Sequence, residues 1–135
     1  MEPRDALEFI KQHHRAVLAT TRRDGNPQLS LVAAGVEGDT VVVSTRETAN
    51  KTKNLRRRPW ASLVVFTDGF WGEWIQVEGA VEIASLPEAM DGLIEYYRQI
   101  SGEHPDWDDY RAAMERERRV LLRITVERAG PDKAG

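Results

Sequence analysis

The hydrophobic positions of the chain recur with two different periods, which separate short strands from short helices. Alternation or unbroken apolar runs predict strands at residues 16–21, 28–36, 40–45, 61–67, 74–84 and 120–126. Apolar spacing of three and four residues predicts helices at residues 6–13, 48–57, 86–101 and 106–117. Strands therefore dominate the pattern, and strand and helix do not alternate regularly.

Turn and cap residues set the boundaries of these elements. The turn signals at residues 24–27 and 37–39 are expected to join the first three strands into an antiparallel meander. Ser85 and Glu88 have the spacing of a capping box at the start of the third helix. Gly102 is the expected stop of that helix.

Six short strands without strand–helix–strand alternation predict a mainly β protein, built as a small six-stranded antiparallel barrel. Closing the sheet would remove the exposed edges that a short chain otherwise has to protect. At 135 residues the chain is long enough for one domain with a real core. We expect this domain to span residues 1–128, and residues 129–135 to form a flexible tail.

Composition excludes several kinds of chemistry. The chain has no Cys, which rules out disulfides, thiolate metal sites and a cysteine nucleophile. Its three His residues lack the spacing of metal ligands, and no P-loop or dinucleotide fingerprint is present, so we predict no metal site and no nucleotide motif. No apolar run approaches the roughly 20 residues of a membrane helix, and the N-terminal segment lacks the apolar stretch of a secretory signal. We therefore expect a cytoplasmic protein with no membrane partner.

The formal net charge of −3 hides a local excess of bases. Between Ser44 and Arg58 there are six bases and one acid, which gives this segment +5 and leaves −8 for the rest of the chain. A solvated helix face, a pocket for a phosphorylated ligand and a nucleic-acid stripe all fit such a segment. The acidic remainder of the chain makes the nucleic-acid reading the weakest.

The strongest local pattern lies inside this basic segment. A strand ends in the hydroxyl residues Ser44 and Thr45, and the next helix begins with Lys51, Lys53 and Asn54. Strand-end hydroxyls, a helix N-terminus and a lysine together are suited to binding a phosphate. Lys51 and Asn54 share one helix face and Lys53 lies on another, so they cannot all contact one anion. A solvated helix face explains the same pattern about as well.

Tryptophan is frequent, with four residues in the chain. Trp60, Trp71 and Trp74 flank the fourth and fifth predicted strands. Packing in a core or an interface is the simpler interpretation. The alternative is that one of them lies against a planar ligand.

Four segments carry a resemblance to a known family: AVLATTRRDGNPQLSLV, VVVSTRETANKTKNLRRRPWASLVV, WIQVEGAVEI and ISGEHPDWDDYRAAMERERRVLLRI. They resemble the split-barrel proteins related to pyridoxamine 5′-phosphate oxidase, and more narrowly the actinobacterial branch that uses the deazaflavin coenzyme F-420. The resemblance runs from about Ala16 to Ile124. It implies a six-stranded split barrel of the FMN-binding type, which forms a homodimer with the cofactor in clefts between the subunits.

The resemblance also implies positions for the cofactor. Its phosphate would lie near Ser44, Thr45, Lys51, Lys53 and Asn54. Its flat ring would run along Leu29, Ser30, Leu31 and Val32, with Trp74 nearby.

The chain departs from the family pattern at three places. Ala49 and Asn50 stand where relatives carry an Arg before the lysine, so the phosphate contact is either weaker or supplied by Arg46. Leu31 stands where many deazaflavin relatives carry Asn. The C-terminal extension that binds pyridoxal phosphate in true pyridoxamine phosphate oxidases is missing, which argues against that activity.

The function that the resemblance implies is hydride transfer from reduced coenzyme F-420 to a small unsaturated organic substrate. An FMN-binding oxidoreductase or flavin carrier is the alternative, and a cofactor-free nucleic-acid-binding barrel is the weakest. The sequence itself identifies no catalytic acid, base or nucleophile.

Overall fold

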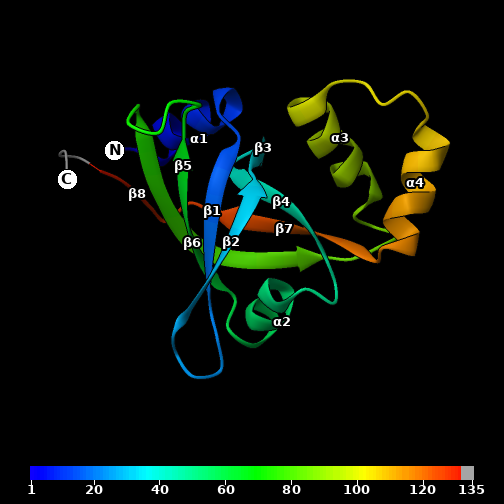
Figure 1. Cartoon of the computed structure of the whole chain (residues 1–135), viewed down its shortest axis with the longest axis horizontal. Coiled ribbons are helices and arrows are strands. Elements are labelled where there is room, and N and C mark those ends of the chain that lie inside the picture. The colour runs from blue at the N-terminus through cyan, green and yellow to red at the C-terminus, as the bar shows by residue number, and fades with distance from the viewer. Residues whose placement is uncertain (132–135) are drawn as a thin grey trace.

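The computed structural model describes residues 1–131, in which four helices and eight strands are present (Figure 1). The helices are α1 (Pro3–Gln12), α2 (Asn50–Arg57), α3 (Met90–Ser101) and α4 (Trp107–Arg116). The strands are β1 (Arg15–Thr21), β2 (Pro27–Ala33), β3 (Gly35–Glu37), β4 (Thr40–Arg46), β5 (Trp60–Phe66), β6 (Trp74–Ala84), β7 (Arg119–Thr125) and β8 (Arg128–Gly130).

The strands form one antiparallel sheet that curls back on itself. Its order is β2-β1-β5-β6-β7-β4-β3, with β8 paired to β6. The two ends of this order, β2 and β3, are consecutive in the chain and are separated only by Ala34. The two edges of the sheet are thus joined by a single residue. The mainly β split-barrel architecture predicted from the sequence is confirmed.

The structure has eight strands and not the six expected, because the predicted strand at 28–36 is broken at Ala34 and because residues 128–130 form the additional strand β8. The break is fixed by groups from elsewhere in the chain. The Ala34 N–H donates to the His14 carbonyl (2.8 Å), and the His14 ring Nδ1 lies 2.8 Å from the Ala34 carbonyl. The side-chain amide of Gln99 bonds both the N–H (2.7 Å) and the carbonyl (2.8 Å) of Val36. The first three strands therefore form two hairpins instead of a continuous meander.

Two apolar clusters hold the fold together. The larger one fills the barrel, with Leu18, Leu63 and Leu122 fully buried. Helices α1 and α2 cover its opposite ends (Figure 1), and each inserts a buried side chain, Ile10 and Leu55. The smaller cluster lies between the outer face of β4 and β7 and the α3–α4 pair. Burial of each such side chain is worth about 1.5–3 kcal/mol.

The helix boundaries bear out some of the expected caps. Helix α3 ends at Gly102, which has the positive φ of 81° that favours glycine. The expected capping box at Ser85 and Glu88 is wrong, because α3 begins only at Met90 and has no side-chain cap. The Ser85 carbonyl accepts a hydrogen bond from the Ala89 N–H (3.0 Å). The Ser85 hydroxyl lies 3.4 Å from an Arg56 nitrogen.

The C-terminal segment is more ordered than expected. Ala129 and Gly130, expected in the tail, lie in β8, where they pair with Val77 and Gln76 of β6. The last expected tail residues, 132–135, lie outside the described residues. Within residues 1–131, no helix has the length and apolar character needed to cross a membrane.

The crossing of the chain between β7 and β8 gives the first prediction. Gly79 of β6 lies directly under this crossing, and a Cβ there would overlap the main-chain carbonyl of Thr125. We expect Gly79→Ala to lower the free energy of unfolding by about 1–3 kcal/mol. Chemical denaturation measures the loss. Gly69→Ala, where nothing lies within 4 Å, is the control and should change stability little. Equal stability of the two variants would contradict the packing described.

Candidate functional site

Helix α2 is fixed to the end of β4, which determines where its first side chains lie. The Thr52 hydroxyl donates to the Arg46 carbonyl (2.6 Å), and the Ala49 N–H donates to the same oxygen (3.1 Å). Leu55, one turn further on, is buried in the barrel core. The first turn of α2 is therefore held against the last residue of the strand.

Lys51 in this turn is a half-buried cation. Within residues 1–131, its ammonium group forms no hydrogen bond and no ion pair. Burial lowers the pKa of Lys51, and the positive charge of Arg119 lowers it further. The protein thus bears the cost of partly burying a cation without giving it a counter-ion.

One residue of another element, Arg119, lies close enough to this ammonium group for its charge to act on it, and Tyr96 and Ser44 are linked to Arg119 in turn. Arg119 begins β7 and lies opposite Arg46 in the β4–β7 ladder. The Tyr96 hydroxyl, from α3, donates to the Ala33 carbonyl at the end of β2 (2.7 Å). Burial raises the pKa of Tyr96, while the backbone of Ser44 and the charge of Arg119 act in the opposite direction. We call Ser44, Lys51, Tyr96 and Arg119 the Lys51 cluster.

The other predicted phosphate residues are not in this cluster. Thr45 is buried opposite Val120 on the core side of β4. Asn54 is buried too: its side-chain N–H donates to the Thr20 hydroxyl (3.1 Å), and its oxygen accepts from Arg57 (3.1 Å). This geometry anchors α2 to β1.

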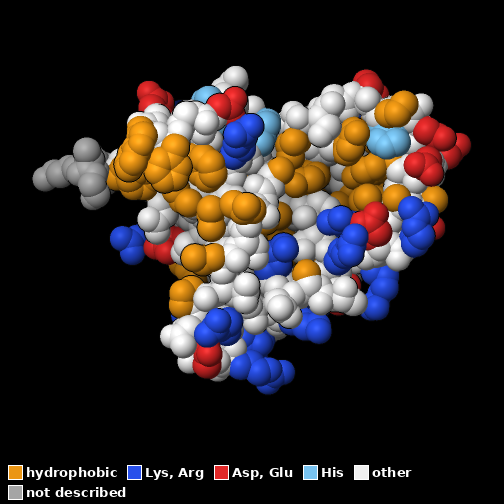
Figure 2. Space-filling model, in the orientation of Figure 1, with side chains coloured by type: hydrophobic (Ala, Val, Ile, Leu, Met, Phe, Trp, Pro, Cys, Tyr) orange, Lys and Arg blue, Asp and Glu red, His pale blue; other side chains and the backbone are white. Residues whose placement is uncertain are grey.

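Lys53 is exposed and faces a different side of α2. It lines a cavity of about 630 Å³ between α2 and the β1–β2 hairpin. Among the described residues, the lining has no Asp or Glu and has five bases: Arg22, Arg23, Lys53, Arg56 and Arg57. Lys and Arg side chains gather around α2 and along the boundary with the α3–α4 pair (Figure 2). The expectation that Lys51 and Lys53 cannot contact one anion agrees with this geometry.

The residues predicted to line the ring divide between two faces of the sheet. Leu29 and Leu31 point outward on β2, and Leu31 is 84% exposed. Ser30 and Val32 lie on the barrel side, opposite Leu18 and Ala16. Because β2 is the end strand of the sheet order, residues 29–32 also border its free edge.

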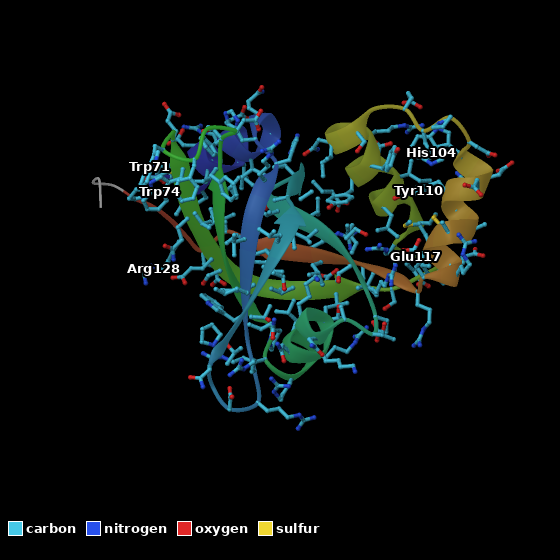
Figure 3. All side chains as sticks on the ribbon, in the orientation of Figure 1. Trp71, Trp74, His104, Tyr110, Glu117 and Arg128 are labelled. Atoms are coloured by element: carbon cyan, nitrogen blue, oxygen red, sulfur yellow. The ribbon has the colours of Figure 1, made fainter. Side chains whose placement is uncertain are left out.

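The outward face is strongly apolar. In the strand register, Leu31, Val17 and Val64 stand side by side across β2, β1 and β5. They line a cavity of about 460 Å³ together with Trp71 and Trp74, and Trp71 is 93% exposed. Figure 2 shows this apolar surface over the sheet, and Figure 3 places Trp71 and Trp74 at its edge. We call it the outer apolar face. The tryptophans here are surface residues and not core residues.

Sequence reasoning missed Arg119 and Tyr96. The apolar alternation at 120–126 indicates the core positions of β7 but gives no role to Arg119, which comes just before them. Tyr96 lies within the helical pattern of 86–101, which predicts a helix and no binding residue. The one sequence signal for Tyr96 is that its polar hydroxyl stands at the edge of the apolar face of this helix.

A curled antiparallel sheet broken at one strand, with a basic strand-to-helix turn at its end, defines a split-barrel protein. The chain belongs to the pyridoxamine 5′-phosphate oxidase family, whose sequence profile matches residues 3–131. It is 27% identical over 127 residues to an F-420H(2)-dependent biliverdin reductase of Mycobacterium tuberculosis (strain CDC 1551 / Oshkosh), covering 92% of this chain and 83% of that protein.

Solved structures share the fold at lower identity. The conserved hypothetical protein Rv2991 of M. tuberculosis superposes with a TM-score of 0.78 at 24% identity, covering 100% of this chain and 92% of that one. An F-420 reductase has a TM-score of 0.70 at 19% identity, with coverages of 91% and 94%. The heme storage protein HutZ of Vibrio cholerae has a TM-score of 0.73 at 15% identity, with coverages of 96% and 94%. Because one of these proteins stores heme, the fold alone does not determine the bound group.

The partly buried charge of Lys51 gives the second prediction. Its pKa is lower in the folded than in the unfolded chain, so the native state binds fewer protons. The partly buried ammonium group therefore destabilises the folded protein fully at any pH below its folded-state pKa. This destabilisation is lost as the pH rises towards 10.5, the ordinary pKa of lysine. We expect Lys51→Met to raise the melting temperature at pH 7, and this gain to shrink by pH 10. Differential scanning fluorimetry at both values measures the effect.

The matched control is Lys53→Met, which replaces an exposed lysine of the same helix and should change stability little. A lower melting temperature for Lys51→Met at pH 7 would mean that the ammonium group is compensated within the protein.

Proposed function

We propose that the protein is an oxidoreductase that binds coenzyme F-420 with its phosphate at Lys51, and that it acts on a small unsaturated organic substrate. Membership of the pyridoxamine 5′-phosphate oxidase family supports a flavin or deazaflavin cofactor. The similarity to an F-420H(2)-dependent biliverdin reductase favours the deazaflavin.

The observation that carries the proposal is the unpaired, half-buried Lys51. A lysine on a merely solvated helix face keeps its hydration and needs no partner. Lys51 has lost part of its hydration, and a phosphate would supply both a counter-ion and hydrogen-bond acceptors. The main chain of Ser44 bonds the Tyr96 hydroxyl, which also interacts with the charge of Arg119.

The basic cavity beside α2 favours F-420 over FMN. FMN carries one phosphate and no acidic tail, whereas F-420 carries a long acidic tail. The five bases of this cavity have two carboxylate partners among the described residues: Arg22 pairs with Asp24 and Arg56 pairs with Glu47. The remaining positive charge suits a chain of carboxylates. FMN remains the second candidate, because the family is defined by a flavin-dependent oxidase.

The bound coenzyme would supply the hydride chemistry, and the protein would supply position and exclusion of water. Lys51 holds the phosphate end. The free edge of β2 offers main-chain groups and apolar side chains to a flat ring. The Tyr96 hydroxyl keeps its proton, since burial raises its pKa, and fixes the end of β2 through the Ala33 carbonyl.

The outer apolar face completes the proposal as a homodimer interface. Leu29, Leu31, Phe70, Trp71 and Trp74 are all exposed on or beside one side of the sheet. An exposed apolar surface of this kind is typical of a protein–protein interface. A second copy would cover it and would bring another chain next to β2, where we place the ring.

A fluorescence titration with F-420, FMN and riboflavin tests the cofactor and gives the third prediction. We expect F-420 to bind most tightly. Lys51→Ala should weaken binding of F-420 and FMN by about tenfold or more, because a charge-assisted hydrogen bond is lost. Riboflavin, which lacks the phosphate, should be affected much less.

Lys53→Ala is the control for this titration and should leave FMN affinity nearly unchanged. Tighter binding of FMN than of F-420 would move the protein to the flavin group. Absence of binding by all three ligands would overturn the proposal.

The fourth prediction concerns the dimer. Leu31→Glu places a charge at the centre of the outer apolar face and should convert the dimer to a monomer, measured by size-exclusion chromatography with light scattering. Ala112→Glu, on the exposed face of α4, is the control and should remain dimeric. If the unaltered protein is monomeric at micromolar concentration, the outer apolar face has another role.

A further inference from the structure

Glu117, at the point where α4 ends and β7 begins, holds two guanidinium groups (Figure 3). Its Oε1 accepts from Arg119 Nε (3.1 Å) and Nη2 (2.8 Å), and from Arg46 Nη2 (3.3 Å). The hydrogen bond from Arg119 is the main reason that the pKa of Glu117 is lowered. This carboxylate therefore stays ionised and fixes the direction of the Arg119 side chain.

The charges around this point do not balance. Arg46 and Arg119 face each other across the β4–β7 ladder, and Lys51 lies close enough to Arg119 for their charges to interact. Glu117 bonds two of these three cations, Arg46 and Arg119, and Lys51 has no carboxylate partner among the described residues. Two more acids line a cavity together with Arg119: Glu47, which is engaged by two nitrogens of Arg56 (2.9 and 2.7 Å), and Glu115, whose charge is matched by that of Arg118 in the same lining. Two positive charges are left over, and this excess suits the negative charge of a bound phosphate ester.

Arg119 is better placed than Arg46 to contact a bound phosphate. Its side chain is 27% exposed, compared with 58% for Arg46. Glu117 occupies the Nε side of the Arg119 guanidinium, so the N–H groups on the other side remain for a second anion. Arg46 has one longer bond to Glu117 and lies mostly in solvent.

We infer that Arg119, positioned by Glu117, is the second cation of the phosphate site beside Lys51. The inference rests on the proposed function, and it identifies what replaces the Arg that related sequences carry at the positions of Ala49 and Asn50. The two cations come from different elements, α2 and β7, and approach the phosphate from different directions. Glu117 is a positioning residue, and it contacts the ligand only through Arg119.

Arg123 provides a closely matched control. It lies four residues further along β7 on the same face, its side chain is 25% exposed, and its Nε bonds a carboxylate of Glu37 (2.7 Å). Both arginines bond a carboxylate through Nε on the same strand, and Arg123 has a second, longer contact to Glu82 (3.4 Å). Arg119 differs from Arg123 in that it lies near Lys51.

The experiment compares FMN, riboflavin and F-420 binding to the unaltered protein and to four variants, Arg119→Gln, Arg119→Lys, Glu117→Gln and Arg123→Gln. We expect Arg119→Gln to weaken FMN and F-420 binding by about 10- to 100-fold. Riboflavin binding should change less than threefold. Arg119→Lys should recover part of the loss. Glu117→Gln should lower the ratio of FMN to riboflavin affinity, and Arg123→Gln should leave that ratio unchanged. Circular dichroism confirms that each variant is folded.

In a second experiment, calorimetry measures the binding of inorganic pyrophosphate, so the result does not depend on any cofactor. Pyrophosphate binding that is lost in Arg119→Gln but kept in Arg123→Gln supports the anion site, even if no cofactor binds and the proposed function fails. The inference is overturned if Arg119→Gln and Arg123→Gln behave alike towards FMN and pyrophosphate. It is also overturned if neither a cofactor nor pyrophosphate binds the unaltered protein.

Discussion

The break of one strand at Ala34 is the constraint on which the rest of this structure depends. It allows β2 to pair with β1 and β3 with β4, so that one chain segment joins both edges of the sheet. The main-chain groups released at the break are taken up by His14 and Gln99, and Tyr96 bonds the last residue of β2. Because Tyr96 and Gln99 belong to α3, the same contacts that close the barrel hold α3 against the free edge of β2. Barrel closure and site geometry therefore have a common cause.

The sequence predicted the elements that depend on local signals. Most strands follow from alternation or apolar runs, and the end of α3 follows from the conformational freedom of Gly102. The break at Ala34 was not predictable, because its hydrogen-bond partners come from residues 20 and 63 positions away along the chain. The failed capping box has the same explanation, since the Ser85 hydroxyl lies beside Arg56 of α2. Strand β8 was missed because three residues ending in glycine carry no period of their own.

The same distinction applies to the candidate site, where residues with a local sequence signal were predictable and residues that depend on distant contacts were not. The prominence of Lys51 was predictable from its place at a helix start after two strand-end hydroxyls. Asn54 has the same local context, but it bonds Thr20, which is 34 residues earlier, and anchors α2. Arg119 follows Lys51 by 68 positions and comes near it only through the pairing of β4 with β7. Its environment follows from topology, and topology is the part of the structure that single-sequence patterns describe least well.

The central claim is that the fold keeps a partly buried ammonium group at Lys51 without a counter-ion until a phosphate binds. The chain has four lysines, so ¹³C NMR of the reductively methylated protein can resolve and titrate each one, with Lys51→Arg assigning the signal. The account predicts that the pKa of Lys51 lies below those of the other lysines in the free protein. It also predicts that this pKa rises when F-420 or FMN is added and does not rise with riboflavin. An ordinary lysine pKa in the free protein, unchanged by either phosphorylated cofactor, would contradict the account.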